Sequence, residues 1–118
     1  MINWKDYSTM VRAIMKPGYN IAADMTESDA HMIHMCMGIS GESGELLDAI
    51  KKAVIYKKPL DMENLIEELG DIEFYLEGLR SHLNVSRDDV IKTNIDKLSK
   101  RYSTGTYSDA QAINREDK

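Results

Sequence analysis

The sequence predicts an all-α protein with a four-helix-bundle-like fold, and three observations support this class. Apolar residues recur at spacings of three and four along almost the whole chain, which is the helical period. Sustained period-two alternation, which would indicate half-buried strands, is absent from the sequence. N-cap residue types stand just before several of the apolar runs. With 118 residues, the chain has the length of one globular domain.

The helix boundaries follow from capping residues and helix breakers. The expected helices cover residues 4–15, 26–56, 61–83 and 86–102. Thr26, Asp61 and Ser86 are the expected N-caps of the last three. Pro17 ends the first helix, and a loop is expected from there to about Met25.

The C-terminal residues differ from the rest of the chain. From Ser103 onward the sequence is polar and aperiodic. We therefore expect a single helical domain over 1–103 and a tail over 104–118 that is mobile or lies on a partner.

Composition and charge exclude several classes of protein. The formal net charge is −5 and the Lys and Arg residues are dispersed, so no broad basic face is available for a nucleic-acid polymer. Cys36 is alone and cannot form an internal disulfide. No N-terminal apolar run resembles a signal peptide or a membrane span. These features predict a cytoplasmic protein with no nucleic-acid or membrane partner.

Carboxylate pairs lie beside the apolar stripes of the second and third expected helices. Because a helix turns by about 100° per residue, Glu42 and Glu45 fall roughly 60° and 120° to one side of the stripe of the second helix. Glu68 and Asp71 occupy the same flank of the third helix. The stripe residues are Met32, Cys36, Ile39, Leu46 and Ile50 on the second helix and Leu65, Leu69, Ile72, Leu76, Leu79 and Leu83 on the third.

The fourth expected helix carries an amide and cations on the corresponding flank. These residues are Asn94, Lys97 and Arg101, beside a stripe of Ile91, Ile95, Leu98 and Tyr102. Facing helices of a bundle often build metal sites in their core, so the acidic flanks and this cationic flank predict a charged site at the edge of one seam.

Carboxylates that converge in this way repel one another unless a cation neutralises them. Oxygen-only ligands favour hard ions such as Mg²⁺ or Mn²⁺, and the Glu-x-x-His signature of diiron bundles is absent from both pairs. Gly41, Gly44 and Gly70 interleave the acids, and we expect their missing side chains to let a neighbouring helix or a ligand approach. The alternative is that each acidic pair is part of a solvated helix face.

The ordered set of motifs resembles the MazG-like, all-α nucleoside triphosphate pyrophosphohydrolases. The matching segments are "ESGE", with Glu42 and Glu45, "ELGD", with Glu68 and Asp71, the "KK" of residues 51 and 52, and "NIDKLSKRY" from Asn94 to Tyr102. The resemblance covers about residues 28 to 103. Many members of the family carry another acid where this chain has Gly41.

The resemblance implies Mg²⁺-dependent hydrolysis of a nucleoside or deoxynucleoside triphosphate to the monophosphate and pyrophosphate. The family's metal ligands would be Glu42, Glu45, Glu68 and Asp71. One of the glutamates, with Glu45 preferred over Glu42, would orient or deprotonate the attacking water. Alternatives are a related phosphoanhydride substrate such as a phosphoribosyl nucleotide, and a noncatalytic helical module whose acidic flank binds a basic partner.

The resemblance also assigns the residues that hold the substrate. Lys97 and Arg101 would clamp the phosphate tail, with Asn94 as a neutral hydrogen-bond partner, and Lys97 would act on the charge of the transition state. Tyr75, one turn after Asp71, is a further expected ligand contact. The expected substrate contacts at the end of the second helix are Lys51 and Lys52, although lysines that end a helix more often serve only its dipole.

Two further stretches bear on packing. The run from His31 to Met37 could suit copper(I), but Met32 and Cys36 fit the apolar stripe, so we expect core packing there. Phe74 falls roughly opposite the main stripe of the third helix. A large ring on that side, together with the small core of four such helices, predicts a homodimer. The resemblance agrees, and it allows a tetramer.

Overall fold

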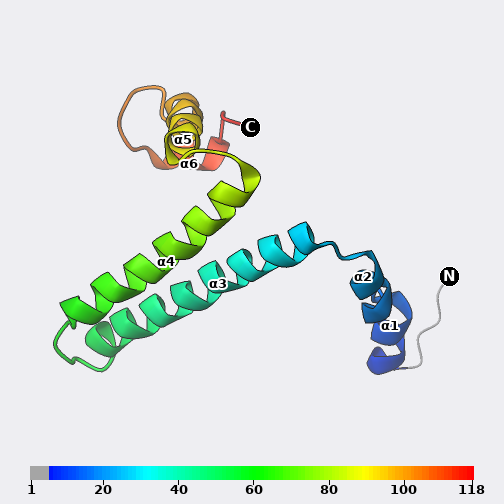
Figure 1. Ribbon diagram of the computed structural model, residues 1–118. Helices are drawn as coiled ribbons and strands as arrows, with labels where there is room; N and C mark the ends of the chain where they lie inside the picture. The colour runs from blue at the N-terminus through cyan, green and yellow to red at the C-terminus, as the bar shows by residue number, and fades with distance from the viewer. Residues whose placement is uncertain (1–5) are drawn as a thin grey trace.

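A computed structural model describes residues 6–118 of the chain, and within them every regular element is a helix (Figure 1). The helices are α1 (Tyr7–Ile14), α2 (Gly18–Asp24), α3 (Glu27–Val54), α4 (Met62–Leu83), α5 (Arg87–Arg101) and α6 (Asp109–Asn114). The expected all-α class is confirmed. Across the described residues, no helix combines the length and the apolar character that a membrane span requires.

The expected N-caps of the three long helices are confirmed by their hydrogen bonds. The backbone N–H of Asp29 donates to the Thr26 hydroxyl at 3.0 Å, and the Asp29 carboxylate accepts from the Thr26 backbone N–H at 3.1 Å. Asp61 accepts from the N–H of Asn64 at 3.1 Å and so begins α4. Ser86 and Asp89 form a second capping box at the start of α5.

Two segments expected to be irregular are helical. The loop predicted from Pro17 to Met25 contains α2, because a proline that ends one helix is also compatible with the first turn of the next. The tail, predicted to be mobile or to lie on a partner, contains α6, whose cap Ser108 accepts from the N–H of Gln111 at 3.3 Å. α1 begins after Asp6, and the start predicted at residue 4 lies outside the described residues.

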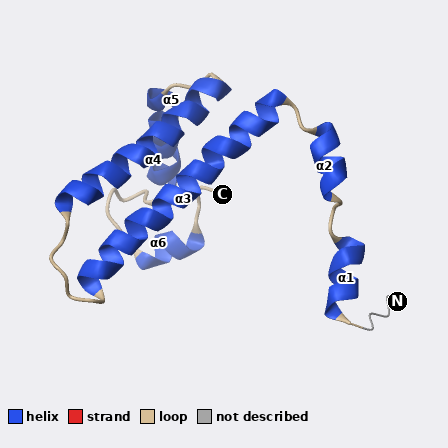
Figure 2. Cartoon of the chain, turned by 60° about the horizontal axis from the view of Figure 1, so that its bottom comes forward, coloured by secondary structure: helices blue, strands red, loops and turns tan. Residues whose placement is uncertain are grey.

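α3 and α4 form an antiparallel hairpin, joined by residues 55–61, that is the main packed unit of the chain (Figure 2). Their close approach depends on glycines other than the expected ones. A Cβ on Gly38 would overlap the Tyr75 ring, and a Cβ on Gly78 would stand 2.5 Å from the Met35 sulfur. Apart from the adjoining residues and backbone of the same helix, no described atom lies within 4 Å of where a Cβ on Gly41, Gly44 or Gly70 would stand.

The buried core of the hairpin is small and lies one residue away from the expected stripe of α3. Among the described residues, Met35 (6% exposed) and Leu65 (8% exposed) form the buried core. Cys36, which was expected in the core, is exposed because the face of α3 that meets α4 is centred on Met35 and Gly38. Leu69 of the expected α4 stripe is also exposed, at 51%.

α5 leaves the end of the hairpin instead of covering it. Asn84 adopts the left-handed conformation (φ 62°) directly after α4, and the chain turns there into α5, which packs against α6 (Figure 1). The radius of gyration is 20.5 Å, whereas a compact domain of this length has about 13.5 Å. A single chain therefore does not close a four-helix core.

Candidate metal centre

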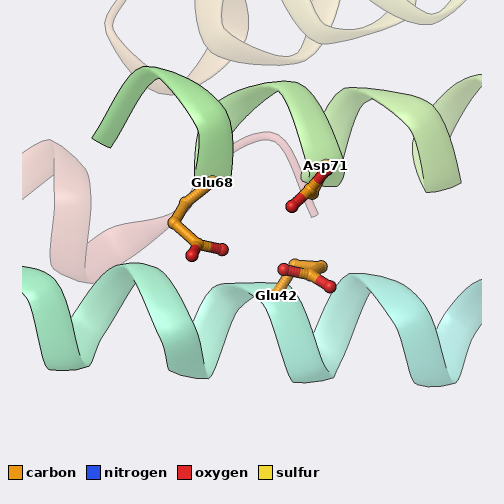
Figure 3. A group of neighbouring side chains, drawn as sticks. All are labelled: Glu42, Glu68 and Asp71. Carbon is orange, nitrogen blue, oxygen red and sulfur yellow. The ribbon is translucent and has the colours of Figure 1, made fainter. Parts of the chain in front are cut away.

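Three of the four paired acids meet in the middle of the hairpin. Glu42 on α3 faces Glu68 and Asp71 on α4, and each offers one carboxylate oxygen such that all three oxygens lie within 4.8 Å of one another. Figure 3 shows the three side chains pointing into the space between the helices. Glu68 and Asp71 share a face of α4 because residues three apart lie on one side of a helix.

The electrostatics of this acidic group centre on Glu68. The pKa of its carboxyl is raised, first because a proton on Glu68 can be shared in a hydrogen bond with Glu42. Partial burial raises it further, as do the negative charges of Glu42, Glu45 and Asp71. Glu68 Oε2 is buried and has no hydrogen-bond partner in the described structure. With every carboxyl ionised, the group holds unneutralised charge.

A hard divalent cation fits this arrangement. The oxygens come from carboxylates alone, which suits Mg²⁺ or Mn²⁺ better than a softer metal. A cation would also supply a partner for the unpaired oxygen of Glu68 and remove the repulsion that raises its pKa.

Glu45 lies at the margin of the acidic group. It is exposed and is not one of the residues whose oxygens lie within 4.8 Å of one another, but its charge contributes to the raised pKa of Glu68. Three residues rotate a helix by roughly 300°, so Glu45 lies about 60° around α3 from Glu42 and one turn further along. The sequence placed both glutamates on one flank, and the structure distinguishes an inner from an outer one.

The cationic flank of α5 lies elsewhere in the chain. Asn94 and Lys97 are exposed on α5, which packs against α6 beyond the end of the hairpin. Arg101 is bound by Asp117 of the C-terminal segment, with Nε to Oδ1 at 2.8 Å. Within one chain the structure therefore brings the acids of α3 and α4 together and does not bring the α5 residues to them.

Comparison with known proteins identifies the family. The family model of the MazG nucleotide pyrophosphohydrolase domain matches residues 30–106. The chain belongs to the MazG family. A relative, the Gene 37 protein of Mycobacterium phage L5, is 30% identical over 100 residues, which cover 74% of this chain and 88% of that protein. No solved structure gives a significant match.

The MazG domain contains both acidic pairs and α5, and it ends before α6. The family is one of nucleotide pyrophosphohydrolases that generally depend on divalent metal ions, so the acidic group lies in the part of the chain that defines the family.

Three other residues proposed from the sequence lie within the MazG domain near the hairpin. Lys51 and Lys52 both approach Asp48, at 3.8 Å and 3.1 Å, in the last turns of α3. Tyr75 packs its ring on Gly38 and stands edge-on to His34, with ring centroids 6.2 Å apart. Tyr75 thus lies between the two helices.

Sequence reasoning missed the residues that stabilise the α3–α4 hairpin and the contact of α5 with the C-terminal segment. Gly38 and Gly78 permit the hairpin contact, and they carry no side chain that a hydrophobic pattern would register. Asp117 was assigned to a polar tail, yet its side chain is 0% exposed and pairs with Arg101. The available signal was Ser108 three residues before Gln111, the capping-box spacing that begins α6.

Proposed function

We propose that this MazG-family protein hydrolyses nucleoside or deoxynucleoside triphosphates to the monophosphate and pyrophosphate, with Mg²⁺ or Mn²⁺ at the acidic group of the hairpin. The observation that carries the proposal is the convergence of Glu42, Glu68 and Asp71 oxygens within 4.8 Å from two helices. The buried, unpaired oxygen of Glu68 adds to it, because such an atom needs a cation or a donor.

Glu42, Glu68 and Asp71 are the proposed inner ligands, with Glu45 beside them. A bound divalent ion would neutralise charge between these acids and the triphosphate and would make nearby water more acidic. Glu45 is exposed and lies outside the tight group, so its carboxylate is free to accept the proton of the attacking water. We therefore assign Glu45 as the general base, and Glu42 as a ligand that also orients the water.

The substrate contacts are proposed on α5. Lys97 and Arg101 carry charge that suits the phosphate chain, and Asn94 adds a neutral donor on the same flank. Tyr75 is proposed to contact the nucleotide beside the hairpin, and Lys51 and Lys52 to reach its phosphates from the end of α3. α5 stands away from the acids of its own chain. We therefore place Lys97 and Arg101 of one chain beside the acids of a second chain.

A homodimer supplies that second chain. Large apolar side chains of α4 remain exposed, including Ile66 (63%), Leu69 (51%) and Phe74 (68%). Exposed apolar area of this extent, on a chain whose described residues include only two buried apolar side chains, favours association with a copy. A two-fold pair of hairpins would complete a four-helix core, and a pair of pairs would give a tetramer.

A triphosphate screen tests the function. Purified protein is incubated with each common nucleoside and deoxynucleoside triphosphate and Mg²⁺, and pyrophosphate and monophosphate are measured. We expect release of both products from at least one triphosphate and loss of release when a chelator removes the metal. A phosphoribosyl nucleotide belongs in the same screen. Activity on this compound alone would show that the substrate is a related phosphoanhydride and not a triphosphate. Absence of pyrophosphate release from every substrate would reject the proposal.

A further inference from the structure

The C-terminal segment, residues 103–118, folds back on the end of α5. The ring centroids of Tyr102 and Tyr107 lie 5.9 Å apart, and the Gln111 side chain donates to the Ser103 hydroxyl at 3.2 Å. The segment ends with Asp117, whose side chain is 0% exposed against Arg101, itself 17% exposed. Residues 107–118 lie beyond the part of the chain that the MazG domain matches.

The contact between Asp117 and Arg101 uses one edge of the guanidinium. Nε donates to Oδ1 at 2.8 Å and Nη2 donates to Oδ2 at 3.0 Å. A guanidinium has five N–H donors, and this side-on pair uses two of them. Asp117 leaves the other hydrogen of Nη2 and both hydrogens of Nη1, which include the end-on fork that matches a phosphate. The Tyr102 side chain also interacts with this guanidinium and, after Asp117, helps to raise the pKa of Arg101.

The local charge still favours an anion. Arg115 brings Nη2 to 3.9 Å from Asp117 Oδ2, so two guanidinium groups surround one carboxylate. The pKa of Asp117 is lowered to about 2, mainly by the hydrogen bonds from Arg101. Asp117 is therefore ionised at neutral pH, and it fixes the Arg101 side chain without cancelling the positive charge of the pair of arginines.

We propose that Asp117 is a positioning residue for polyphosphate binding, which holds Arg101 side-on and presents its end-on fork to the phosphate chain of the substrate. The inference rests on the proposed function, since it assumes that Arg101 contacts phosphate. It assigns a role to a segment outside the MazG domain. Holding one long side chain in a fixed rotamer removes an ordering cost on the scale of about threefold to tenfold in affinity.

A competing role for the same contact makes the opposite prediction. If the Asp117 carboxylate occupied the place of a phosphate on Arg101, its removal would free the arginine and tighten binding. The side-on geometry favours positioning over competition, because the fork that best fits phosphate is the part of Arg101 that Asp117 leaves unused.

The first test is spectroscopic and needs no turnover. In ¹⁵N-labelled full-length protein, a paired Arg101 should give a protected Nε–H signal, assigned by its loss in Arg101→Ala. Asp117→Asn should abolish that protection, whereas Glu116→Gln, which removes the same charge from the exposed neighbouring residue, should keep it. A protected signal that survives Asp117→Asn would overturn the pairing.

The second test measures binding and kinetics on the same variants. Asp117→Asn should weaken binding of inorganic tripolyphosphate and raise KM by about threefold to tenfold, with a smaller change in kcat. Glu116→Gln should match the wild type. Adding Asp117→Asn to Arg101→Ala should change neither quantity further, because the carboxylate acts through the guanidinium.

The outcomes separate the inference from the proposed function. Tighter binding by Asp117→Asn would establish competition and overturn positioning. A lower melting temperature with unchanged KM and tripolyphosphate affinity would reduce Asp117 to a structural role and also overturn it. A wild type that binds tripolyphosphate with this dependence on Asp117 but hydrolyses no triphosphate would reject the proposed function and support the positioning role.

Discussion

The α3–α4 hairpin carries its acids on helices that pack directly on each other, whereas α5 carries its cations on a helix that packs against the C-terminal segment. The hairpin therefore assembles its acidic group within one chain. The α5 flank is held in place, through Arg101 and Asp117, at a distance from those acids. The acids of the proposed site are thus brought together within one chain, and the proposed cationic residues lie away from them.

This difference follows from how the elements are connected. α3 and α4 are linked by residues 55–61, a short connection that makes antiparallel neighbours of them. α4 is 22 residues long and its acids lie near its middle, so α5, which starts beyond Leu83, begins several turns away from them. A second chain is the simplest way to bring the proposed cations to the acids.

Glu68→Gln should have the largest effect. Replacing one inner carboxylate removes a metal ligand and the centre of the charge cluster, which corresponds to about 4 kcal/mol of transition-state stabilisation or a thousandfold loss of turnover. The metal-free variant should melt at a higher temperature than the metal-free wild type, because repulsion is relieved, and Mg²⁺ should raise its melting temperature less.

Glu67→Gln is the matched control, because Glu67 is the exposed neighbour of Glu68 on α4 and its substitution removes the same charge. Its turnover and its response to Mg²⁺ should stay near those of the wild type. A wild-type melting curve that saturating Mg²⁺ and Mn²⁺ both leave unmoved would remove the basis for a metal at this site.

Lys97→Ala tests the other half of the comparison. Lys97 is exposed on α5, so its loss should leave folding and metal binding nearly intact while turnover falls by roughly a hundredfold, the scale of one preorganised electrostatic contact. Mixing Lys97→Ala chains with Glu68→Gln chains should then restore about a quarter of wild-type activity. Half of the randomly paired dimers are mixed, and each has one intact site of two.

Lys100→Ala is the control for this flank, since it lies about 60° around α5 from Lys97. It should change turnover little. Equal losses in the two lysine variants would reject the assignment of the flank to the substrate, and mixtures that regain no activity would show that the acids and cations of one site come from the same chain.

The convergence of the acids was predictable because it depends on local features. The caps Thr26 and Asp61 fix the starts of α3 and α4 through hydrogen bonds within one turn, and helical periodicity then places Glu42 opposite Glu68 and Asp71 once the helices pair. The sequence could not separate Glu45 from Glu42, because that distinction depends on how far each helix is rotated toward its neighbour.

The parts that sequence reasoning missed depend on packing. A glycine gives no apolar signal, so Gly38 shifted the contact face of α3 to Met35 while the pattern pointed to Cys36. The position of α5 depends on the turn at Asn84 and on contacts with residues beyond Ser103, neither of which periodicity reports. The N-cap at Ser108 was a local signal, and it was overlooked because the surrounding sequence is polar.

Phe74→Glu tests whether a second chain covers the hairpin. Phe74 is 68% exposed on α4, and a charge there would be desolvated in a dimer seam, which should weaken dimerisation by about 2 to 4 kcal/mol. Sedimentation equilibrium should show wild-type dimers and variant monomers at the same concentration. Glu73→Gln, an exposed change one residue away, should leave the dimer intact. A wild type that sediments as a monomer over the whole concentration range would exclude the two-chain site.

Gly38→Ala and Gly41→Ala together compare the packed inner face of α3 with its open surface beside the acids. Their expected effects are the smallest. The added Cβ would overlap the Tyr75 ring, so α3 and α4 must separate or the ring must move, at about 1 to 3 kcal/mol of unfolding free energy. Gly41→Ala meets no described atom within 4 Å and should stabilise α3 by up to about 1 kcal/mol through helix propensity. Urea unfolding of both variants measures the difference. If Gly41→Ala proves as destabilising as Gly38→Ala while the protein is dimeric, then the open side of α3 is an interface between chains, and the two glycines mark contacts of the same kind.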